Sequence, residues 1–229
     1  MTISVIIPTY NEVSTIEQVV RDLRSCSPHS HLVDILVIDG GSTDDTPTKA
    51  RLAGATVFTC PRLGRAAQMN YGAQQATGDV LYFVHADVRI HPDFIDDITQ
   101  ALARGYEAGR YRFRFNSRKV LLRVNSYGTR FSGLMSRGGD QTLFVTRTLF
   151  DKLGGFDEYY VIMEDFDIIR RIEAQARFVI IPKDVVVSAR KYEANSWLRV
   201  QLANLTAVIL FACKVPPARI ARVYRKFLK

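Results

Sequence analysis

Cysteine is scarce in this sequence. Its three cysteines, Cys26, Cys60 and Cys213, are odd in number and widely separated, and no Cys-x-x-Cys pair occurs. A disulfide framework would need a larger, even set, so the spacing fits reduced thiols in a cytosolic protein. We assign the cysteines no chemistry.

Long hydrophobic runs are also missing. The chain enters an apolar stretch at residues 3–7 without the basic segment and long hydrophobic stretch of a signal peptide. The longest charge-free apolar stretch, residues 200–213, is interrupted by Gln201 and Asn204. It is shorter than the roughly 20 residues that span a bilayer. We therefore expect a cytoplasmic protein without a transmembrane helix.

The two common glycine-rich phosphate loops are not present. A dinucleotide-binding domain places glycines directly after its first strand, but residues 8–12 read Pro-Thr-Tyr-Asn-Glu. No Gly-x-x-x-x-Gly-Lys-Ser/Thr loop occurs either. Any diphosphate must be neutralised in another way, and a metal ion with a few arginines is the natural candidate.

The composition favours one large α/β domain with a C-terminal appendage. The chain has 229 residues, of which 47% are hydrophobic, so it can bury a substantial core. Lys and Arg number 31 against 23 Asp and Glu, which gives a net charge of +8. That charge favours anionic partners such as nucleotides, nucleic acid or acidic lipid, and alone it does not choose among them.

Short β-branched runs alternate with helical patterns through the first half, which is typical of a parallel sheet with crossover helices. The strands are expected at residues 3–7, 33–38, 56–59 and 80–85. Helices are expected from Ser14, in a capping-box pattern, from Thr46-Pro47, over 66–76, and from about Pro92.

The second half predicts a mixed or antiparallel region. Aromatic and arginine residues alternate over 109–115, which indicates a strand with a buried aromatic face and a solvent-exposed arginine face. Further strands are expected at 141–146 and 178–181, with a helix between them at about 164–175.

Polar residues follow the predicted strands. Ligands of an open parallel sheet bind outside the carboxyl ends of its strands. The segments at those ends are Pro-Thr-Tyr-Asn-Glu at 8–12, Asp-Gly-Gly-Ser-Thr-Asp at 39–44, Pro-Arg-Leu-Gly-Arg at 61–65 and His-Ala-Asp at 85–87. We expect the functional site at this edge.

Four of these motifs together resemble glycosyltransferase family 2. They are PTYNE, VIDGGSTDDT, HAD and MEDFD, in that order, and the match runs through about the first 180 residues. The resemblance implies an α/β fold of the GT-A type, with a mostly parallel, Rossmann-like central sheet, helices on both faces and a C-terminal helical extension. We divide the chain into a GT-A domain at 1–192 and an amphipathic extension at 193–229. The nucleotide half would cover about 1–107 and the acceptor half about 108–192.

Further segments resemble one bacterial subgroup of that family. They are GRAAQMNYGA at 64–73, His in place of the first Asp in HAD, GDQ at 139–141 and the tail VPPARIARVYR. This subgroup is associated with arsenosugar biosynthesis.

The resemblance places a nucleotide at the first strand ends. Tyr10 would offer a flat face to a pyrimidine, and Asp39 would accept a hydrogen bond from uracil N3–H. Pro8 and Glu12 would flank the base, and Ala86 is assigned to the same pocket. The residues alone also allow a strand end with a core aromatic and an acidic turn.

The same resemblance places Mg²⁺ or Mn²⁺ on Asp87, where it would bridge the donor diphosphate. His85 stands where the family has an aspartate, and it could bind metal, ribose or the backbone. Arg65, and less so Arg62, precede a helix whose N-terminus could face phosphate oxygens. A solvated basic loop is the alternative for both arginines.

Catalysis is assigned to the Glu164-Asp165 pair. By the resemblance, Asp165 is the base that removes the proton from the acceptor hydroxyl, and Glu164 supports it or binds acceptor. The alternative is two acidic residues favoured by the helix dipole in a first turn. Gly139, Asp140 and Gln141 either shape the acceptor pocket or form a turn into a strand.

These assignments predict a metal-dependent, inverting, hexosyltransferase-like enzyme with a nucleotide-sugar donor, a UDP-sugar being favoured. No Gln-x-x-Arg-Trp sequence follows the acidic pair, so we expect transfer of one sugar per encounter. The alternatives are a sugar-1-phosphate nucleotidyltransferase and a non-catalytic nucleotide-sugar-binding relative. We expect no nucleic-acid partner.

The C-terminal segment predicts contact with an acidic membrane or an amphiphilic acceptor. After Pro217, apolar residues recur at helical spacing between basic ones, and no acidic residue follows Glu193. This would place the protein peripherally on the inner face of the membrane. The alternative is that both C-terminal helices pack on the catalytic domain.

Overall fold

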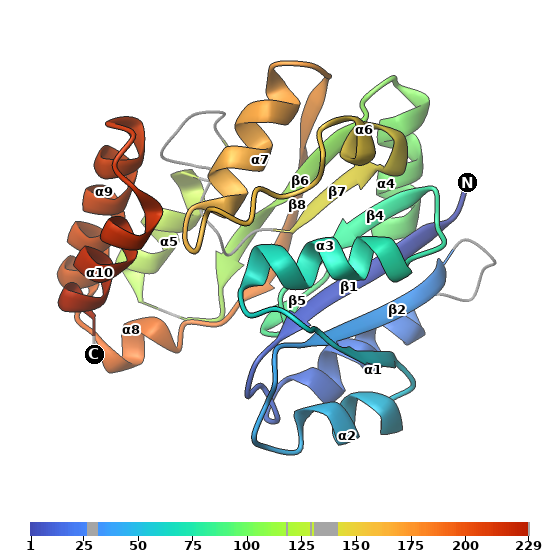
Figure 1. Ribbon diagram of the computed structural model, residues 1–229, viewed down its shortest axis with the longest axis horizontal. Helices are drawn as coiled ribbons and strands as arrows, with labels where there is room; N and C mark the ends of the chain where they lie inside the picture. Colours follow the sequence, from blue (N-terminus) through green and yellow to red (C-terminus); the bar gives the residue numbers. More distant parts are fainter. Residues whose placement is uncertain (27–31, 118, 129, 131–141, 229) are drawn as a thin grey trace.

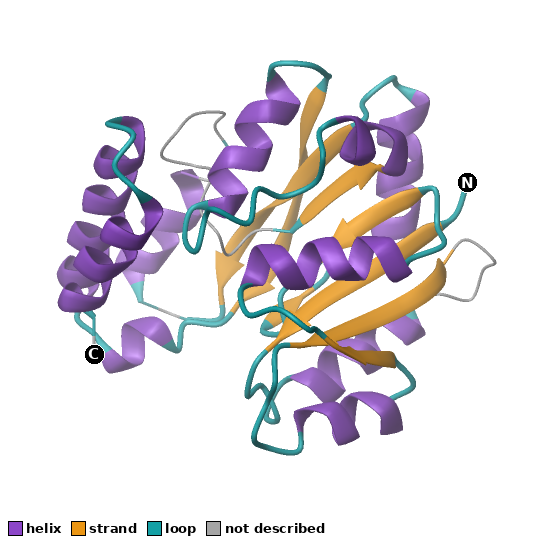
Figure 2. Cartoon of the chain, in the orientation of Figure 1, coloured by secondary structure: helices purple, strands orange, loops and turns teal. Residues whose placement is uncertain are grey.

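The computed structural model describes residues 1–26, 32–117, 119–128, 130 and 142–228. Within these residues an eight-stranded sheet carries helices on both faces, with further helices gathered at one side (Figures 1 and 2). The strands are β1 (Ile3–Thr9), β2 (Leu32–Asp39), β3 (Thr56–Thr59), β4 (Val80–Phe83), β5 (Val88–Arg89), β6 (Ala108–Phe115), β7 (Leu143–Thr146) and β8 (Phe178–Val187).

The helices follow the strands in the expected alternation through the first half. They are α1 (Ile16–Ser25), α2 (Thr46–Leu52), α3 (Arg65–Gln75), α4 (Phe94–Ala103), α5 (Val120–Gly128), α6 (Arg147–Lys152), α7 (Glu164–Glu173), α8 (Lys191–Ala194), α9 (Trp197–Ala212) and α10 (Pro217–Phe227).

The sheet has the strand order β3-β2-β1-β4-β7-β6-β8-β5. The first four strands in this order are parallel, β7 is antiparallel to both of its neighbours, and β6 and β8 are parallel. Strand β5 pairs antiparallel with β8 at the far edge. The predicted α/β architecture and the mixed second half are therefore confirmed.

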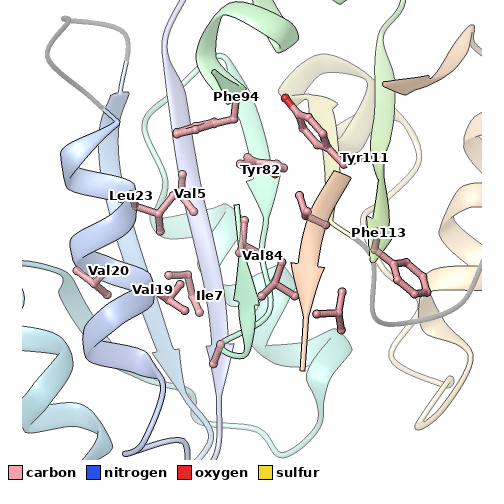
Figure 3. Packing of buried hydrophobic residues seen from close by; sticks show 14 of the residues in the cluster. Val5, Ile7, Val19, Val20, Leu23, Tyr82, Val84, Phe94, Tyr111 and Phe113 are labelled. Carbon is pink, nitrogen blue, oxygen red and sulfur yellow. The ribbon is translucent and has the colours of Figure 1, made fainter. Parts of the chain in front are cut away.

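Strand β1 is buried along its whole length because helices cover both sides of the sheet. Ile3, Val5 and Ile7 pack on the side of α1, α2 and α4, whereas Ile6 packs on the side of α3, α6 and α7. Figure 3 shows the first of these clusters. These two clusters fix the strand ends on which the site is built.

The arginine face of β6 differs from the prediction. Arg114 is exposed, as expected, but Arg110 is only 2% exposed. The prediction of a solvent-exposed arginine face is wrong at Arg110 because Ala108, which precedes it by two residues on the same face, packs in the core cluster on the side of α3, α6 and α7.

Two predicted helix starts also shift. α1 begins at Ile16 with Thr15 as N-cap and no side-chain cap bond, so the capping box at Ser14 is wrong. The Thr15 hydroxyl instead contacts Glu12, at 3.2 Å from its carboxylate. Thr46 is the first residue of α2, and its hydroxyl accepts the backbone N–H of Glu12 at 2.8 Å. Both side chains connect the loop after β1 to its surroundings.

The C-terminal helices pack against each other and against α7. Ile220 of α10 is fully buried in a cluster with Ala207 and Val208 of α9, with Phe166 of α7 and with Met163, the N-cap of α7. Ile220, with Tyr224 partly buried beside it, is therefore used for packing within the protein, which favours the packing alternative for α10. Within the described residues, no helix combines the length and apolar character needed to span a bilayer. The boundary at 192/193 stays a prediction.

Candidate functional site

The site lies where the parallel strands β1, β2 and β4 end. Their carboxyl ends meet at one edge of the sheet because the three strands run in the same direction. The loops at 8–12, 39–46 and 84–87 therefore come together, although they are far apart in sequence.

Gln68 of α3 joins two of these strand ends. Its side-chain amide nitrogen donates to the carbonyl oxygens of Thr9 and Ile38, each at 2.8 Å, and the side chain is buried. These are among the last carbonyls of β1 and β2, which makes Gln68 a clamp across the two strands. A Cβ added at Gly40 would lie 3.0 Å from the same nitrogen. The small residue after Asp39 thus leaves room for the clamp.

The loops after β1 and β2 are also bonded to each other. Asn11 has a positive φ of 55°; its backbone N–H donates to Ser42 Oγ at 2.9 Å, and its side-chain oxygen accepts the N–H of Thr43 at 2.9 Å. The Asp39 carboxylate closes its own turn by accepting the N–H groups of Gly41 and Ser42 at 3.0 and 2.9 Å and the Ser42 hydroxyl. The two loops are consequently joined into one rim.

A pocket of about 240 Å³ opens at this rim, and we call it the strand-end pocket. Its lining residues are Pro8, Thr9, Tyr10, Glu12, Arg65, Gln68, His85, Ala86, Asp87 and Arg190. Thus every residue predicted to bind nucleotide or metal lies here except Asp39, which is buried behind the rim with its oxygens largely occupied by the turn.

Aromatic and charged groups occupy different parts of the strand-end pocket. Tyr10 is 59% exposed, so its ring is accessible for stacking. Glu12 accepts two hydrogen bonds from the guanidinium of Arg190, at 2.9 and 3.3 Å, in a bidentate pair. This pair holds Arg190, which follows β8, against the loop after β1.

The residues at 85–87 fit a divalent cation. Burial, and after it the positive charge of Arg65, lower the pKa of His85 to about 3, so its imidazole is neutral near pH 7. A neutral imidazole and the Asp87 carboxylate are both usable ligands. Among the described residues there is no group of three or more His, Cys, Asp or Glu that could hold a metal ion. Two protein ligands suit an ion that takes its other ligands from substrate phosphates and water.

A second pocket of about 440 Å³ lies between the start of α7 and the helices α9 and α10, and we call it the helix pocket. Its lining residues are Arg65, Val161, Ile162, Met163, Glu164, Asp165, Phe166, Lys191, Gln201, Asn204, Leu205, Ala207, Val208 and Tyr224. The lining is therefore part apolar and part charged. The predicted catalytic residues Glu164 and Asp165 both border it.

The first turn of α7 is held in place by hydrogen bonds to the Asp167 carboxylate. Asp167 is buried and accepts hydrogen bonds from Arg170 at 2.9 Å and Arg171 at 2.7 Å. Arg171 in turn donates to the carbonyls of Leu153 and Gly155, at 3.0 and 2.8 Å. This network fixes the direction in which Glu164 and Asp165 leave the helix.

Arg65 connects the two pockets. It is the first residue of α3 and lines both of them. Its guanidinium lies 3.3 Å from the carboxylate of Glu164, which is 5% exposed. The acidic pair on α7 and the polar strand ends thus belong to one continuous site. Arg62 instead pairs with Glu158 at 2.7 Å, outside both pockets.

The remaining predicted residues, Gly139, Asp140 and Gln141, lie outside the described residues. Three lining residues of the strand-end pocket were given no role by the sequence argument, namely Thr9, Gln68 and Arg190. Gln68 lies within the segment GRAAQMNYGA at 64–73, which the sequence argument noted, but its position inside a helix indicated no role for its side chain. Arg190 had a weak signal, because it is a basic residue just after a strand that is longer than predicted.

The family comparison covers most of the chain. The model of glycosyl transferase family 2 matches residues 4–156. An uncharacterised glycosyltransferase of Mycobacterium tuberculosis is 30% identical over 182 residues, which cover 74% of this chain and 68% of the relative. The glucosyl-3-phosphoglycerate synthase of the same organism is 35% identical over 114 residues, which cover 45% of this chain and 35% of the relative.

Solved structures share the fold. A mannosyltransferase from Pyrobaculum calidifontis in complex with GDP-mannose and Mn²⁺ matches with a TM-score of 0.71 at 21% identity, over 98% of this chain and 69% of that one. The M. tuberculosis glucosyl-3-phosphoglycerate synthase with Mn²⁺, UDP-glucose and phosphoglyceric acid matches with a TM-score of 0.61 at 20% identity, over 94% and 80%. These neighbours confirm the predicted GT-A fold.

The clamp at Gln68 predicts a measurable stability loss. Gln68→Met keeps the length of the side chain but removes the donor, so the buried Ile38 carbonyl loses its side-chain partner. We expect the free energy of unfolding in urea to fall by about 1–3 kcal/mol. The control is Gln18→Met, at a position on α1 where the amide bonds only the side chain of Asp22. A Gln68→Met loss no greater than that of the control would contradict the clamp.

Proposed function

Because the chain belongs to glycosyl transferase family 2, and is therefore a glycosyltransferase, we propose that it moves one sugar from a nucleoside diphosphate sugar to an acceptor hydroxyl with inversion. One observation carries this proposal. The strand-end pocket contains the side chains of His85, Asp87 and Tyr10, the helix pocket is bordered by the carboxylates of Glu164 and Asp165, and Arg65 lines both pockets. Inverting transfer needs the leaving group and the base on opposite sides of the sugar.

The strand-end pocket is proposed to hold the donor nucleotide. Tyr10 would stack on the base, and Arg65 and Arg190 would face the diphosphate. We propose a UDP-sugar, as the residues at 8–12 and Asp39 suggested. Asp39 already accepts three hydrogen bonds, and a carboxylate has about four acceptor positions. At most one position therefore remains for a hydrogen bond from the nucleobase.

Asp87 and His85 are proposed to hold Mg²⁺ or Mn²⁺. The mannosyltransferase and the glucosyl-3-phosphoglycerate synthase were both solved with Mn²⁺ and a nucleotide sugar. When bound, the ion would neutralise the diphosphate and stabilise the negative charge that grows on it as the sugar leaves.

Asp165 is proposed to act as the base. It would accept the proton of the acceptor hydroxyl as that oxygen attacks the sugar from the side of the helix pocket. Glu164 would be a positioning residue, because its carboxylate would hold the Arg65 guanidinium where the two pockets meet. The network around Asp167 would keep both carboxylates in place during the reaction. The family match favours this chemistry over nucleotidyl transfer. The arsenosugar association stays a prediction, and the acceptor is unassigned.

We also propose peripheral contact with the inner, anionic face of a membrane, through α9 and α5 instead of α10. Leu198, Leu202, Leu205 and Ile209 follow one face of α9 and are 42–60% exposed. On α5, Val120, Leu121, Val124 and Tyr127 are 50–69% exposed. Together these eight residues form the apolar surface.

The two helices of the apolar surface are bonded through Tyr192. Its hydroxyl accepts from Asn125 of α5 at 3.4 Å and from Gln201 of α9 at 3.2 Å. Leu205 also lines the helix pocket, so the apolar surface continues into the proposed acceptor site.

Charge favours a lipid surface over a second copy of the chain. No acidic residue occurs in 108–139 or 194–229, whereas both segments contain several Arg and Lys residues. Two such surfaces would repel each other, but an anionic bilayer would attract them.

Metal and Asp87 are predicted to be needed for nucleotide binding, because a diphosphate beside a carboxylate is repelled unless a cation intervenes. We expect calorimetry to show UDP binding in Mn²⁺ that weakens about tenfold or more with EDTA or in Asp87→Ala. The control is Asp96→Ala, at an exposed position on α4. Equal UDP affinity with and without EDTA would contradict the metal site. Tighter binding of GDP than of UDP would contradict uracil as the nucleobase of the donor.

Asp165→Asn is predicted to fold and bind donor but to lose transfer, because an amide keeps the shape and loses the proton acceptor. We expect kcat to fall by about 10²–10⁴-fold with UDP affinity unchanged. The control is Asp151→Asn, at an exposed position at the end of α6. Since the acceptor is unassigned, transfer is measured with the best of a panel of amphiphilic and sugar alcohols. Transfer by Asp165→Asn within a factor of about three of the parent would remove this residue from the role.

Membrane contact is predicted to depend on the apolar surface. In co-sedimentation with phosphatidylglycerol liposomes at low salt, Leu198→Ser/Leu202→Ser should lower the partition coefficient about tenfold, equivalent to about 1.4 kcal/mol. Leu52→Ser/Leu63→Ser is the matched control, since those leucines are 82% and 88% exposed elsewhere. If the parent stays in the supernatant, or both double variants pellet alike, the surface does not bind membranes.

A further inference from the structure

A third cavity, of about 620 Å³, lies away from both pockets of the proposed active site. We call it the basic groove. It is lined by Asp22, Arg89, Ile90, His91, Pro92, Arg112, Arg114, Arg130, Pro182, Lys183, Asp184 and Val186. None of these residues lines the strand-end pocket or the helix pocket.

The strand register explains why the groove is charged. Phe113, Phe115, Val185 and Val187 point into the main core. Side chains alternate along a strand, so the residues between them face outward from β6 and β8. Arg112 is the register partner of Asp184, Arg114 that of Val186, and Val186 that of Arg89 on β5. Arg112 and Arg114 of β6 therefore lie on the same outer face of the sheet as Arg89 of β5.

Positive charge in the basic groove is poorly balanced. In the part of the chain that the structure describes, none of Arg89, Arg112, Arg114 and Arg130 forms an ion pair. The groove's lysine, Lys183, is held by Asp93 and Asp97 at 2.8 and 2.7 Å. Four guanidinium groups thus share the groove with two carboxylates, those of Asp22 and Asp184.

Arg112 adds an observation that points to a ligand. Its Nε is buried and has no hydrogen-bond partner among the described residues. Asp184 is its register partner, yet no ion pair joins these two described residues. A buried donor without a partner needs an explanation, and a bound ligand or ion is one. Here the donor belongs to the most enclosed of four arginines that line one groove.

We propose that the basic groove binds a ligand carrying phosphate groups. The planar fork of a guanidinium matches two phosphate oxygens, and several arginines around one anion add geometric specificity. The groove has room for more than one phosphate group. Two sources share this chemistry, a soluble phosphorylated compound and the headgroup of an anionic lipid. Arg130 lies over the ring of Tyr127 at 4.8 Å, which connects the groove to the apolar surface on α5.

The test measures binding of sodium tripolyphosphate to the full chain by calorimetry, with EDTA present. The groove variant is Arg114→Gln/Arg130→Gln, in which both changed side chains are exposed. The matched control is Arg222→Gln/Arg225→Gln, which removes the same charge from exposed positions on α10. We expect the groove variant to bind about tenfold more weakly than the parent, and the control to bind within about twofold of it.

Arg112→Gln tests the buried donor separately, and we expect it to weaken binding as well, with thermal unfolding confirming that each variant is folded. Vesicles of phosphatidic acid in phosphatidylcholine then identify the source. If the groove variant loses vesicle binding too, the ligand is a lipid headgroup; if it loses only tripolyphosphate, the ligand is soluble. Absence of tripolyphosphate binding to the parent, or equal losses in the groove variant and the α10 control, would overturn the proposal and leave a solvated basic face.

Discussion

The hydrogen bonds from one buried amide, that of Gln68, to the ends of β1 and β2 are the constraint on which the site depends. Adjacent parallel strands place their last residues side by side, but the loops that follow would otherwise be free to diverge. With both carbonyls held, Tyr10 and Asp39 leave the sheet at fixed positions. The bonds from Asn11 to Ser42 and Thr43 then make the two loops move as one.

The acidic side of the site is fixed by a separate set of charges. Hydrogen bonds from Arg170 and Arg171 to Asp167 stabilise the first turn of α7. Arg171 also donates to two carbonyl oxygens of the loop that precedes α7. Ion pairs on a buried carboxylate such as Asp167 contribute little net stability, but they specify position when the carboxylate is fully hydrogen-bonded. Arg65 then joins the acidic turn to the strand ends. The proposed chemistry would thus depend on two separately fixed groups of residues that meet at Arg65.

The sequence predicted those parts of the fold that local patterns control. β1 to β4 were found because their apolar runs are short and bounded by polar loops, and seven of the predicted site residues line the strand-end pocket. Gln68 and Arg190 were missed because their roles depend on contacts with residues distant in sequence. Arg110 was misplaced because alternation along a strand does not reveal which of its ends is covered. The short strand β5 and helix α5 carry too weak a pattern to stand out.

The placement of β5 has a consequence for the order in which the protein is made. β4 and β5 are separated by only four residues, yet β5 pairs with β8 near the C-terminal side of the sheet. The segment that carries His85 and Asp87 therefore lies between β4 and β5. The partner of β5, strand β8, is synthesised about 90 residues later. The ion pair between Glu12 and Arg190 spans 178 residues in the same way. Such long-range closures form late in folding. The residues proposed to bind the donor and the metal would thus meet partners from residues 180–190 only after that part of the chain has been synthesised, so this edge of the sheet is completed by segments made far apart in time.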